Sequence, residues 1–282
     1  MNPWMTYVKE RFPLPVYLVL VTGFCASGAL LVGGKVLSVP TLCAFIGLMV
    51  FFAMLRMMDE VKDYEKDKVA NPTRPLPRGL LDVNYVKQII SSTVLGMCGY
   101  AILLTFVFSW QAGLTYGFLT VWLWLMYREF YTGHWLENHQ IFYAITHQFI
   151  LVPVTLLPIV LNDSSALFLN TSWIFAGLIV GSFFSYEVCR KLNPDAHPLL
   201  KTYRAMYGMS GVIAIVVCTC ALAIFSAYQL GLQSFLWPFS FALLISFIFI
   251  RMNHHKVVET VATLSLVVHI WSIVLYRVKE LL

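Results

Sequence analysis

Residues 205–250 read AMYGMSGVIAIVVCTCALAIFSAYQLGLQSFLWPFSFALLISFIFI, a run of 46 residues without a single Asp, Glu, Lys or Arg. A helix that crosses the hydrocarbon core of a bilayer needs about 20 predominantly apolar residues. The run is therefore long enough for two membrane-spanning helices. It is predominantly apolar without alternation, whereas the strands of a membrane barrel alternate between apolar and polar residues, so helices are favoured.

The composition of the whole chain agrees with this interpretation. Only 12% of the 282 residues are charged and 59% are hydrophobic, whereas soluble domains carry about 25% charged residues. This balance excludes an ordinary soluble protein. It also excludes a disordered chain, which is poor in apolar residues. The sequence predicts a polytopic membrane protein.

Charge-free intervals along the chain predict where the membrane spans lie. Seven such intervals occur, and two of them are long enough for two spans each. We predict nine helices, near residues 14–34, 37–56, 86–109, 112–129, 140–161, 171–190, 205–227, 232–251 and 258–277. The fold class is therefore an all-α integral membrane protein.

The basic residues predict the orientation of these spans. If the N-terminus is cytoplasmic, the cytoplasmic segments hold 16 Lys and Arg residues and the opposite segments hold 3. Cytoplasmic loops carry such an excess of Lys and Arg. We therefore expect a multi-pass protein of the cell or inner membrane, with its C-terminus on the far side. The positive charge is a signal of topology and gives no indication of nucleic-acid binding.

One polar segment, residues 56–79, follows the second predicted span and reads RMMDEVKDYEKDKVANPTRPLPRG. Asp59, Asp63 and Asp67 are four residues apart, so they lie near one face if the helix continues, with Glu60 beside them. Carboxylates on one face repel each other, and a divalent cation removes that repulsion. Mg²⁺ typically binds one or two carboxylates and completes its shell with phosphate oxygens.

The end of the same segment adds basic residues. Asn71-Pro72 predicts the end of the helix, and Arg74 and Arg78 follow in a proline-rich turn. Arginine matches the geometry of phosphate oxygens, so this segment has the groups that a diphosphate requires. The alternative is a solvent-exposed charged loop, which is the role we expect for Lys62, Glu65, Lys66 and Lys68.

A second polar segment, residues 187–204, follows the sixth predicted span and reads EVCRKLNPDAHPLLKTYR. Glu187, Lys191 and Asp195 are again four residues apart, although Pro194 ends a helix before Asp195. Four spans separate the two segments, so both lie on the cytoplasmic side and can face one cavity. In the alternative interpretation, the basic residues only anchor the spans at the membrane interface.

The two polar segments resemble the motifs of the UbiA superfamily of intramembrane prenyltransferases. That superfamily carries Asn-Asp-x-x-Asp-x-x-x-Asp after its second helix, followed by an Arg-Pro-Leu-Pro-like turn. Alignment on residues 74–77 places Asp63 and Asp67 at the two best-defined metal positions, Glu60 at the preceding Asp and Asp59 at the Asn.

The match to the second motif of the superfamily is incomplete. That motif is Asp-x-x-x-Asp, followed six residues later by Lys-Thr. Asp195 and Lys201-Thr202 fit the spacing, whereas Lys191 stands where the first Asp belongs. An alternative register uses Glu187 as the first acid. The number of metal ions at this segment therefore stays open.

The resemblance implies a fold and an activity. The fold is a single domain of residues 1–282, a bundle of nine helices around a central lipid-accessible cavity, capped by the polar cytoplasmic loops. The activity is Mg²⁺-dependent transfer of an isoprenyl group from a prenyl diphosphate to a membrane-associated acceptor. A related terpene cyclase would ionise the diphosphate without an acceptor. A transporter or lipid-binding protein is the non-enzyme alternative, and no obligate protein partner is inferred.

Breaking an allylic C–O bond requires stabilisation of the departing diphosphate and exclusion of water from the carbocation. The predicted catalytic residues are Asp63, Asp67, Arg74 and Lys201. The predicted metal ligands are Asp59, Glu60, Asp63, Asp67, Glu187 and Asp195. The predicted diphosphate-binding residues are Arg74, Arg78, Arg128, Lys191 and Lys201, and the predicted substrate contacts are Tyr127, Tyr131, His134 and Tyr203. His147, inside the fifth span, is interpreted as a helix–helix hydrogen bond in preference to a pocket residue.

Overall fold

The computed structural model describes residues 2–193, 202–252 and 254–281, and these residues form helices, turns and loops without a β-strand. The α-helices are α1 (Pro3–Arg11), α2 (Leu14–Leu31), α3 (Val39–Lys62), α4 (Tyr64–Ala70), α5 (Val83–Val107), α6 (Trp110–Tyr127), α7 (Gly133–Asn138), α8 (Gln140–Gln148), α9 (Leu151–Asn162), α10 (Asn170–Cys189), α11 (Tyr203–Gln229), α12 (Gln233–Ser246), α13 (His255–Ile270) and α14 (Ser272–Leu281). Three 3₁₀ turns are η1 (Glu129–Tyr131), η2 (Ser164–Phe168) and η4 (Phe247–Met252).

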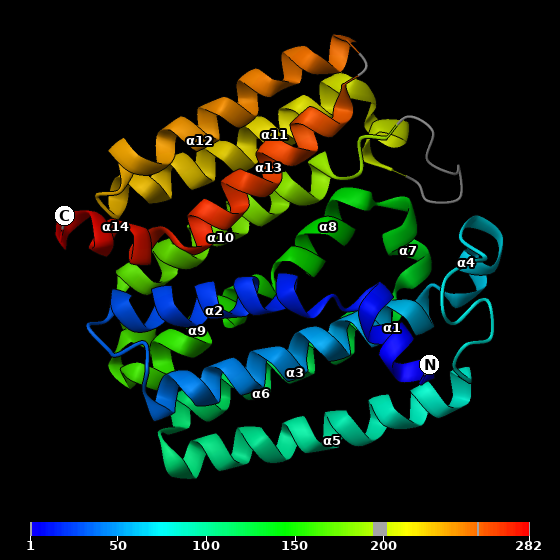
Figure 1. The fold of residues 1–282 in the computed structure, drawn as a ribbon, viewed down its shortest axis with the longest axis horizontal. Helices are drawn as coiled ribbons and strands as arrows, with labels where there is room; N and C mark the ends of the chain where they lie inside the picture. The colour runs from blue at the N-terminus through cyan, green and yellow to red at the C-terminus, as the bar shows by residue number, and fades with distance from the viewer. Residues whose placement is uncertain (1, 194–201, 253, 282) are drawn as a thin grey trace.

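The long helices lie side by side in one layered bundle (Figure 1). Helices α11, α12 and α13 form one edge, α10, α9 and α2 the middle, and α3, α6 and α5 the other edge. The short helices α1, α4 and α7 gather at the end of the bundle that carries the N-terminus, and the C-terminus lies at the opposite end. A chain that crosses the membrane an odd number of times, such as the nine times predicted, has its termini on opposite sides. The assignment of either end to the cytoplasm stays a prediction.

Seven helices of the described chain are long and apolar enough to cross a membrane. An eighth span is present if α13 and α14, which are bent by 64°, count as one broken helix. The predicted span at 112–129 is helix α6, which is not among these seven. Helices therefore occur at all nine predicted places, but nine crossings stay a prediction.

The largest core cluster is formed mainly by α2, α3, α5, α6 and α9. Phe24, Leu48, Phe51 and Tyr116 are among its largest fully buried side chains. A smaller cluster joins α10 to α11, α12 and α13. The outer helix α5 instead exposes large apolar side chains, including Leu95, Ile102 and Phe106. In a membrane protein such a face contacts lipid, so its exposure costs no hydrophobic free energy.

The second predicted span is longer than expected, because α3 continues past residue 56 to Lys62. It ends at Asp63, which joins it to the short helix α4. The backbone bonds from Asp63 N to Asp59 O, 2.9 Å, and from Asp67 N to Asp63 O, 2.8 Å, keep the four-residue pattern across this junction. The three Asp residues thus follow one another on successive turns. Helix α4 ends at Ala70, which confirms the end predicted by Asn71-Pro72.

Helices α10 and α11 form the most extensive helix pair, and small residues line their contact. A Cβ atom on Gly181 would lie 2.6 Å from the Thr219 carbonyl oxygen and 3.0 Å from the Ala223 amide nitrogen. One turn further, the hydroxyl groups of Ser185 and Thr219 are 2.8 Å apart. Small residues and interhelical hydroxyl bonds are the usual means of close helix packing in a membrane.

Replacing Gly181 with Ala is therefore expected to lower the thermal stability of the detergent-solubilised protein. The added methyl group meets backbone atoms, which cannot rotate away, and such overpacking costs about 1–3 kcal/mol. Gly96→Ala is the matched control, because nothing lies within 4 Å of a Cβ at that position of α5. Equal melting temperatures for the two variants would contradict the close approach of α10 and α11.

Candidate active site

The first acidic segment lies where α3 ends and α4 begins, at the end of the bundle that carries the N-terminus. Burial raises the pKa of Asp63, the nearby Lys62 opposes that rise, and the carboxylates of Asp59 and Asp67 add to it. The ionised form of Asp63 is thus disfavoured mainly by burial and further by the neighbouring carboxylates. A positive charge bound to these carboxylates would favour the ionised form.

Asp67 and the turn that follows it form one buried unit. The Asp67 carboxylate is almost fully buried, forms an ion pair with Arg74, and accepts a hydrogen bond from Asn71 Nδ2 at 2.8 Å. Leu76 of the same turn is buried as well. Asp67, a predicted metal ligand, and Arg74, a predicted diphosphate ligand, therefore contact each other directly. Asp67 consequently also holds the Arg-Pro-Leu-Pro turn in place.

Glu60 faces helix α1 instead of the aspartates. Its side chain is buried and forms an ion pair with Arg11, which is the last residue of α1. Arg56 Nε in turn donates a hydrogen bond to the Arg11 carbonyl oxygen at 3.1 Å. The second Glu60 oxygen is buried without a hydrogen-bond partner among the described residues. These contacts leave the predicted metal role of Glu60 untested, but they show that this carboxylate already has a cationic partner.

Helix α1 also reaches the proline-rich turn. Arg78 donates hydrogen bonds to both carboxylate oxygens of Glu10, at 2.9 and 3.0 Å. This bond lowers the pKa of Glu10. In the sequence, the basic residues of this helix indicate only the orientation of the first span, and its two contacts with the acidic segment were not predicted. The available signal was the pair Glu10-Arg11 directly before the first span.

Lys62 connects the acidic segment to helix α8. Its Nζ donates a hydrogen bond to the Tyr143 hydroxyl at 3.0 Å and lies 3.7 Å from an Asp59 oxygen. The expectation that Lys62 is solvent-exposed is wrong, because α3 continues into the bundle and leaves only 11% of this side chain exposed. Lys68 and Glu65, in contrast, form an exposed pair at 3.0 Å, as expected.

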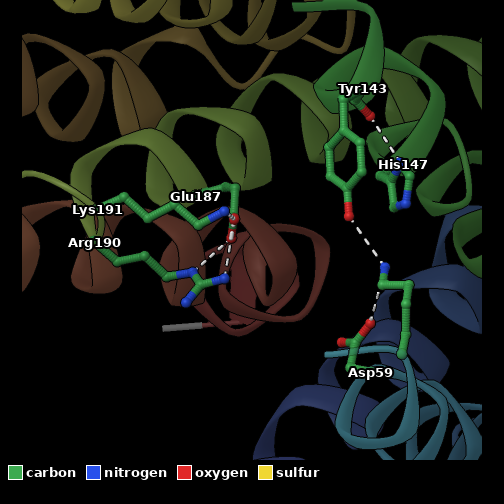
Figure 2. Close-up of polar contacts among 7 residues, drawn as sticks. Asp59, Tyr143, His147, Glu187, Arg190 and Lys191 are labelled. Carbon is green, nitrogen blue, oxygen red and sulfur yellow. Dashed lines mark hydrogen bonds and ion pairs between the residues drawn. The ribbon is translucent and has the colours of Figure 1, made fainter. Parts of the chain in front are cut away.

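His147 lies one turn after Tyr143 on the same helix, and the two rings stack with their centroids 3.9 Å apart (Figure 2). His147 Nδ1 is 2.8 Å from the Tyr143 carbonyl oxygen. The predicted helix–helix bond is therefore wrong, since the ring bonds to its own helix. A carbonyl oxygen only accepts, so Nδ1 carries the proton in this arrangement. Nε2 is then an acceptor, buried and unpartnered within the part of the chain that the structure describes.

The second polar segment forms a compact ion cluster at the end of α10 (Figure 2). Arg190 donates to the two Glu187 oxygens at 2.5 and 2.9 Å, and Lys191 Nζ is 2.7 Å from Glu187 Oε1. Lys191 Nζ also lies 5.6 Å from the ring centroid of buried Tyr203. Asp195 and Lys201 lie outside the described residues.

The two polar segments are close enough to interact electrostatically. Burial lowers the pKa of Arg190, but the Glu187 carboxylate more than compensates, and the Asp59 carboxylate adds to the rise. Figure 2 shows the Glu187 cluster on one side and Asp59 with Tyr143 on the other. The expectation that the segments face each other is consistent with this geometry, while an enclosed cavity between them stays a prediction.

The loop after α6 forms a recess next to the acidic segment, with a volume of about 350 Å³. Its lining residues are Val61, Lys62, Lys87, Tyr127, Arg128, Glu129 and Tyr131. The Arg128 guanidinium lies 5.5 Å from the Tyr131 ring centroid. Two predicted substrate contacts, Tyr127 and Tyr131, thus lie together with Arg128, which was predicted to bind diphosphate. His134, another predicted substrate contact, is exposed on α7 and does not line the recess.

The backbone of this loop is strained. Glu129, Phe130 and Tyr131 have φ angles of 49°, 52° and 57°, which non-glycine residues rarely adopt. The turn places Phe130 against Trp122, with centroids 5.3 Å apart, and against His147, at 6.0 Å. Packing of this ring offsets the strain, and no sequence signal indicated it.

The sequence profile described as the UbiA prenyltransferase family matches residues 19–273. The chain belongs to this family. A solved structure described as digeranylgeranylglyceryl phosphate synthase has the same fold, with a TM-score of 0.63 over 96% of this chain and 98% of that chain. Its sequence is 15% identical. Among curated protein sequences, none matches the chain.

The two polar segments differ in how well their side chains suit Mg²⁺, the ion that the family resemblance implies. No group of three His, Cys, Asp or Glu side chains in the described chain is arranged around a metal position. The first segment nevertheless offers hard carboxylate oxygens on successive turns, and Asp63 lies partly buried near the carboxylates of Asp59 and Asp67. The described part of the second segment does not fit, because both Glu187 oxygens already accept bonds from cations.

The ion pair between α1 and α3 leads to a stability prediction. Arg11→Ala leaves the buried Glu60 carboxylate without its cation, which for buried pairs costs about 3–5 kcal/mol. We expect a clearly lower melting temperature in detergent, and partial recovery in Arg11→Ala/Glu60→Gln, where the buried group is neutral. Lys9→Ala, an exposed residue of the same helix, is the control. No difference between Arg11→Ala and Lys9→Ala would show that α1 does not hold Glu60.

Proposed function

We propose that this UbiA family protein catalyses Mg²⁺-dependent transfer of an isoprenyl group from a prenyl diphosphate to an acceptor in the membrane. The family membership supports an intramembrane prenyltransferase. The single observation behind the finer proposal is the row Asp59, Asp63 and Asp67 at the mouth of an apolar bundle, with Arg74 against it. Acidic oxygens and arginine together match a metal-bound diphosphate.

Each polar group has a separate role in this proposal. Asp59 and Asp63 are the metal ligands, whereas Asp67, whose two oxygens already accept bonds from Asn71 and Arg74, positions Arg74. Bound Mg²⁺ supplies positive charge for the departing diphosphate. Arg74 and Arg78 provide further donors, because neither carboxylate partner uses all five N–H groups of its guanidinium. The buried ring of Tyr203 and the partly buried ring of Tyr127 provide aromatic faces for the allylic cation and limit its contact with water.

The chemical identity of the acceptor substrate is not determined. The similar solved structure suggests which substrates to examine first. That protein is described as digeranylgeranylglyceryl phosphate synthase, so geranylgeranyl diphosphate and glycerol-phosphate lipids belong in the first panel. Prenyl diphosphates of other lengths and a membrane-lipid extract complete it. The cyclase alternative gives a different result, since it releases a diphosphate-free hydrocarbon when a prenyl diphosphate is the only substrate.

The proposal predicts that Asp63→Asn lowers Mg²⁺-dependent consumption of the preferred prenyl diphosphate by about a hundredfold or more, as expected when charge stabilisation is lost. Asp63 is the better test residue, since replacing Asp67 also removes a buried partner of Arg74. Glu65→Gln is the control, because Glu65 is exposed and pairs only with Lys68 in the described contacts. A loss of less than tenfold for Asp63→Asn would contradict the proposal.

A further inference from the structure

The recess beside the first acidic segment has a surplus of positive charge. Its basic residues come from three separate elements, with Lys62 at the end of α3, Lys87 near the start of α5 and Arg128 in the loop after α6. Glu129 is the one acid among the described residues that line it, so three cations face one carboxylate. The volume of about 350 Å³ is within the range of ligand pockets, about 300–1,000 Å³.

Two of these four charged side chains are already balanced by neighbours. Lys62 Nζ lies 3.7 Å from an Asp59 oxygen. The Glu129 carboxylate folds back over Gly133, where a Cβ atom would clash with it, and it acts electrostatically on Lys66. The acid of the recess is therefore turned toward another cation, and its charge does not neutralise the rest of the lining.

Lys87 and Arg128 carry the remaining charge. Both are exposed, and neither forms an ion pair within residues 2–193, 202–252 and 254–281. The Arg128 guanidinium rests on the Tyr131 ring, 5.5 Å from its centroid, and this contact uses none of its N–H donors. Cations of one sign around a hollow raise the local potential and attract an anion. The two side chains are thus accessible donors for a phosphate or a carboxylate.

The strained turn at residues 129–131 is a second indication of a ligand at this recess, independent of charge. All three residues have left-handed φ angles. Glu129 and Tyr131 line the recess, while Phe130 between them packs on Trp122, with ring centroids 5.3 Å apart. Backbone strain persists only where packing maintains it, and it is concentrated at binding and active sites.

We propose that Lys87 and Arg128 bind a phosphate or carboxylate group of the acceptor, so that the second substrate is an anion. This inference rests on the proposed function and specifies the class of its acceptor. It assigns Arg128 to the acceptor instead of the donor diphosphate, for which Arg74 and Arg78 lie on the acidic segment itself. The end of α3 forms one wall of the recess and carries the acidic row, so an acceptor held there lies beside the metal-bound donor.

Binding of matched amphiphiles tests the anion site without turnover. The full chain in detergent is incubated with oleoyl lysophosphatidic acid or with its neutral analogue monoolein, and bound lipid is measured by native mass spectrometry. We expect the phosphate-bearing lipid to bind about tenfold more tightly or better, because charge-assisted hydrogen bonds form with two cations. Equal binding of the two lipids would overturn the inference.

A soluble competitor distinguishes a lipid headgroup from a free anion. sn-Glycerol 1-phosphate carries the same phosphate without the acyl chain. Displacement of lysophosphatidic acid by this competitor would show that a soluble acceptor is recognised as well. Retention of the lipid would restrict the acceptor to membrane lipids, and either result agrees with an anion site.

One lysine variant tests whether the preference arises in the recess. Lys87→Met is expected to remove most of the preference for lysophosphatidic acid over monoolein and to leave the melting temperature unchanged, because the side chain is exposed. Lys9→Met is the matched control, since Lys9 is also exposed and without an ion pair among the described residues. The same preference in both variants would overturn the inference.

Steady-state kinetics separate the recess from the donor site. With the acceptor found in the substrate panel, Lys87→Met is expected to raise the KM for the acceptor about tenfold and to change the KM for the prenyl diphosphate less than about twofold. An equal rise in both values, or equal turnover of a neutral acceptor, would overturn the inference and leave the proposed function intact. No Mg²⁺-dependent consumption of any prenyl diphosphate by the unmodified protein would overturn both.

Discussion

Charged side chains are costly inside the hydrocarbon core of a bilayer, and this constraint determines how the protein is arranged. Its few charges collect at the ends of the helices, and many of the acids lie at the end that carries α1 and α4. Acids that are crowded there and partly buried need positive partners. The ion pairs of Glu60 with Arg11, Asp67 with Arg74 and Glu187 with Arg190 are the result.

These pairs divide the acidic residues into two groups. Glu60, Asp67 and Glu187 have internal cations and therefore contribute to the architecture of the polar end. Asp59 and Asp63 are less completely neutralised, since Lys62 Nζ is 3.7 Å from the Asp59 carboxylate and Asp63 forms no ion pair among the described residues. Unbalanced charge of this kind is characteristic of functional sites. The remaining negative charge is therefore concentrated at the junction of α3 and α4.

The sequence predicted the places of the helices well, because charge-free intervals depend on a solvent constraint that acts on each segment alone. The break at Asn71-Pro72 was predicted for a similar reason, since proline acts locally. The partners of individual side chains were predicted poorly. Lys62 was expected in solvent and His147 in a bond between helices, and both depend on how α3 and α8 meet.

The contribution of α1 and the strained turn at residues 129–131 could not be found in the sequence either. The pair Glu10-Arg11 is equally typical of residues that anchor a span at the membrane interface. Arg11 contacts Glu60 and Glu10 contacts Arg78, and both contacts join residues far apart in the chain. The positive φ angles follow from Phe130 packing on Trp122 and His147. Such contacts arise only when separate helices come together.

The sequence by itself determined that the chain resides in a membrane, where its helices lie, and which segments carry the acidic and basic groups. These properties follow from composition and from spacing within one segment. Only the tertiary structure decided which acids are neutralised by internal cations and which remain available. That outcome depends on distances between side chains of different helices, since electrostatic interactions are short-ranged near water and strong where they are buried.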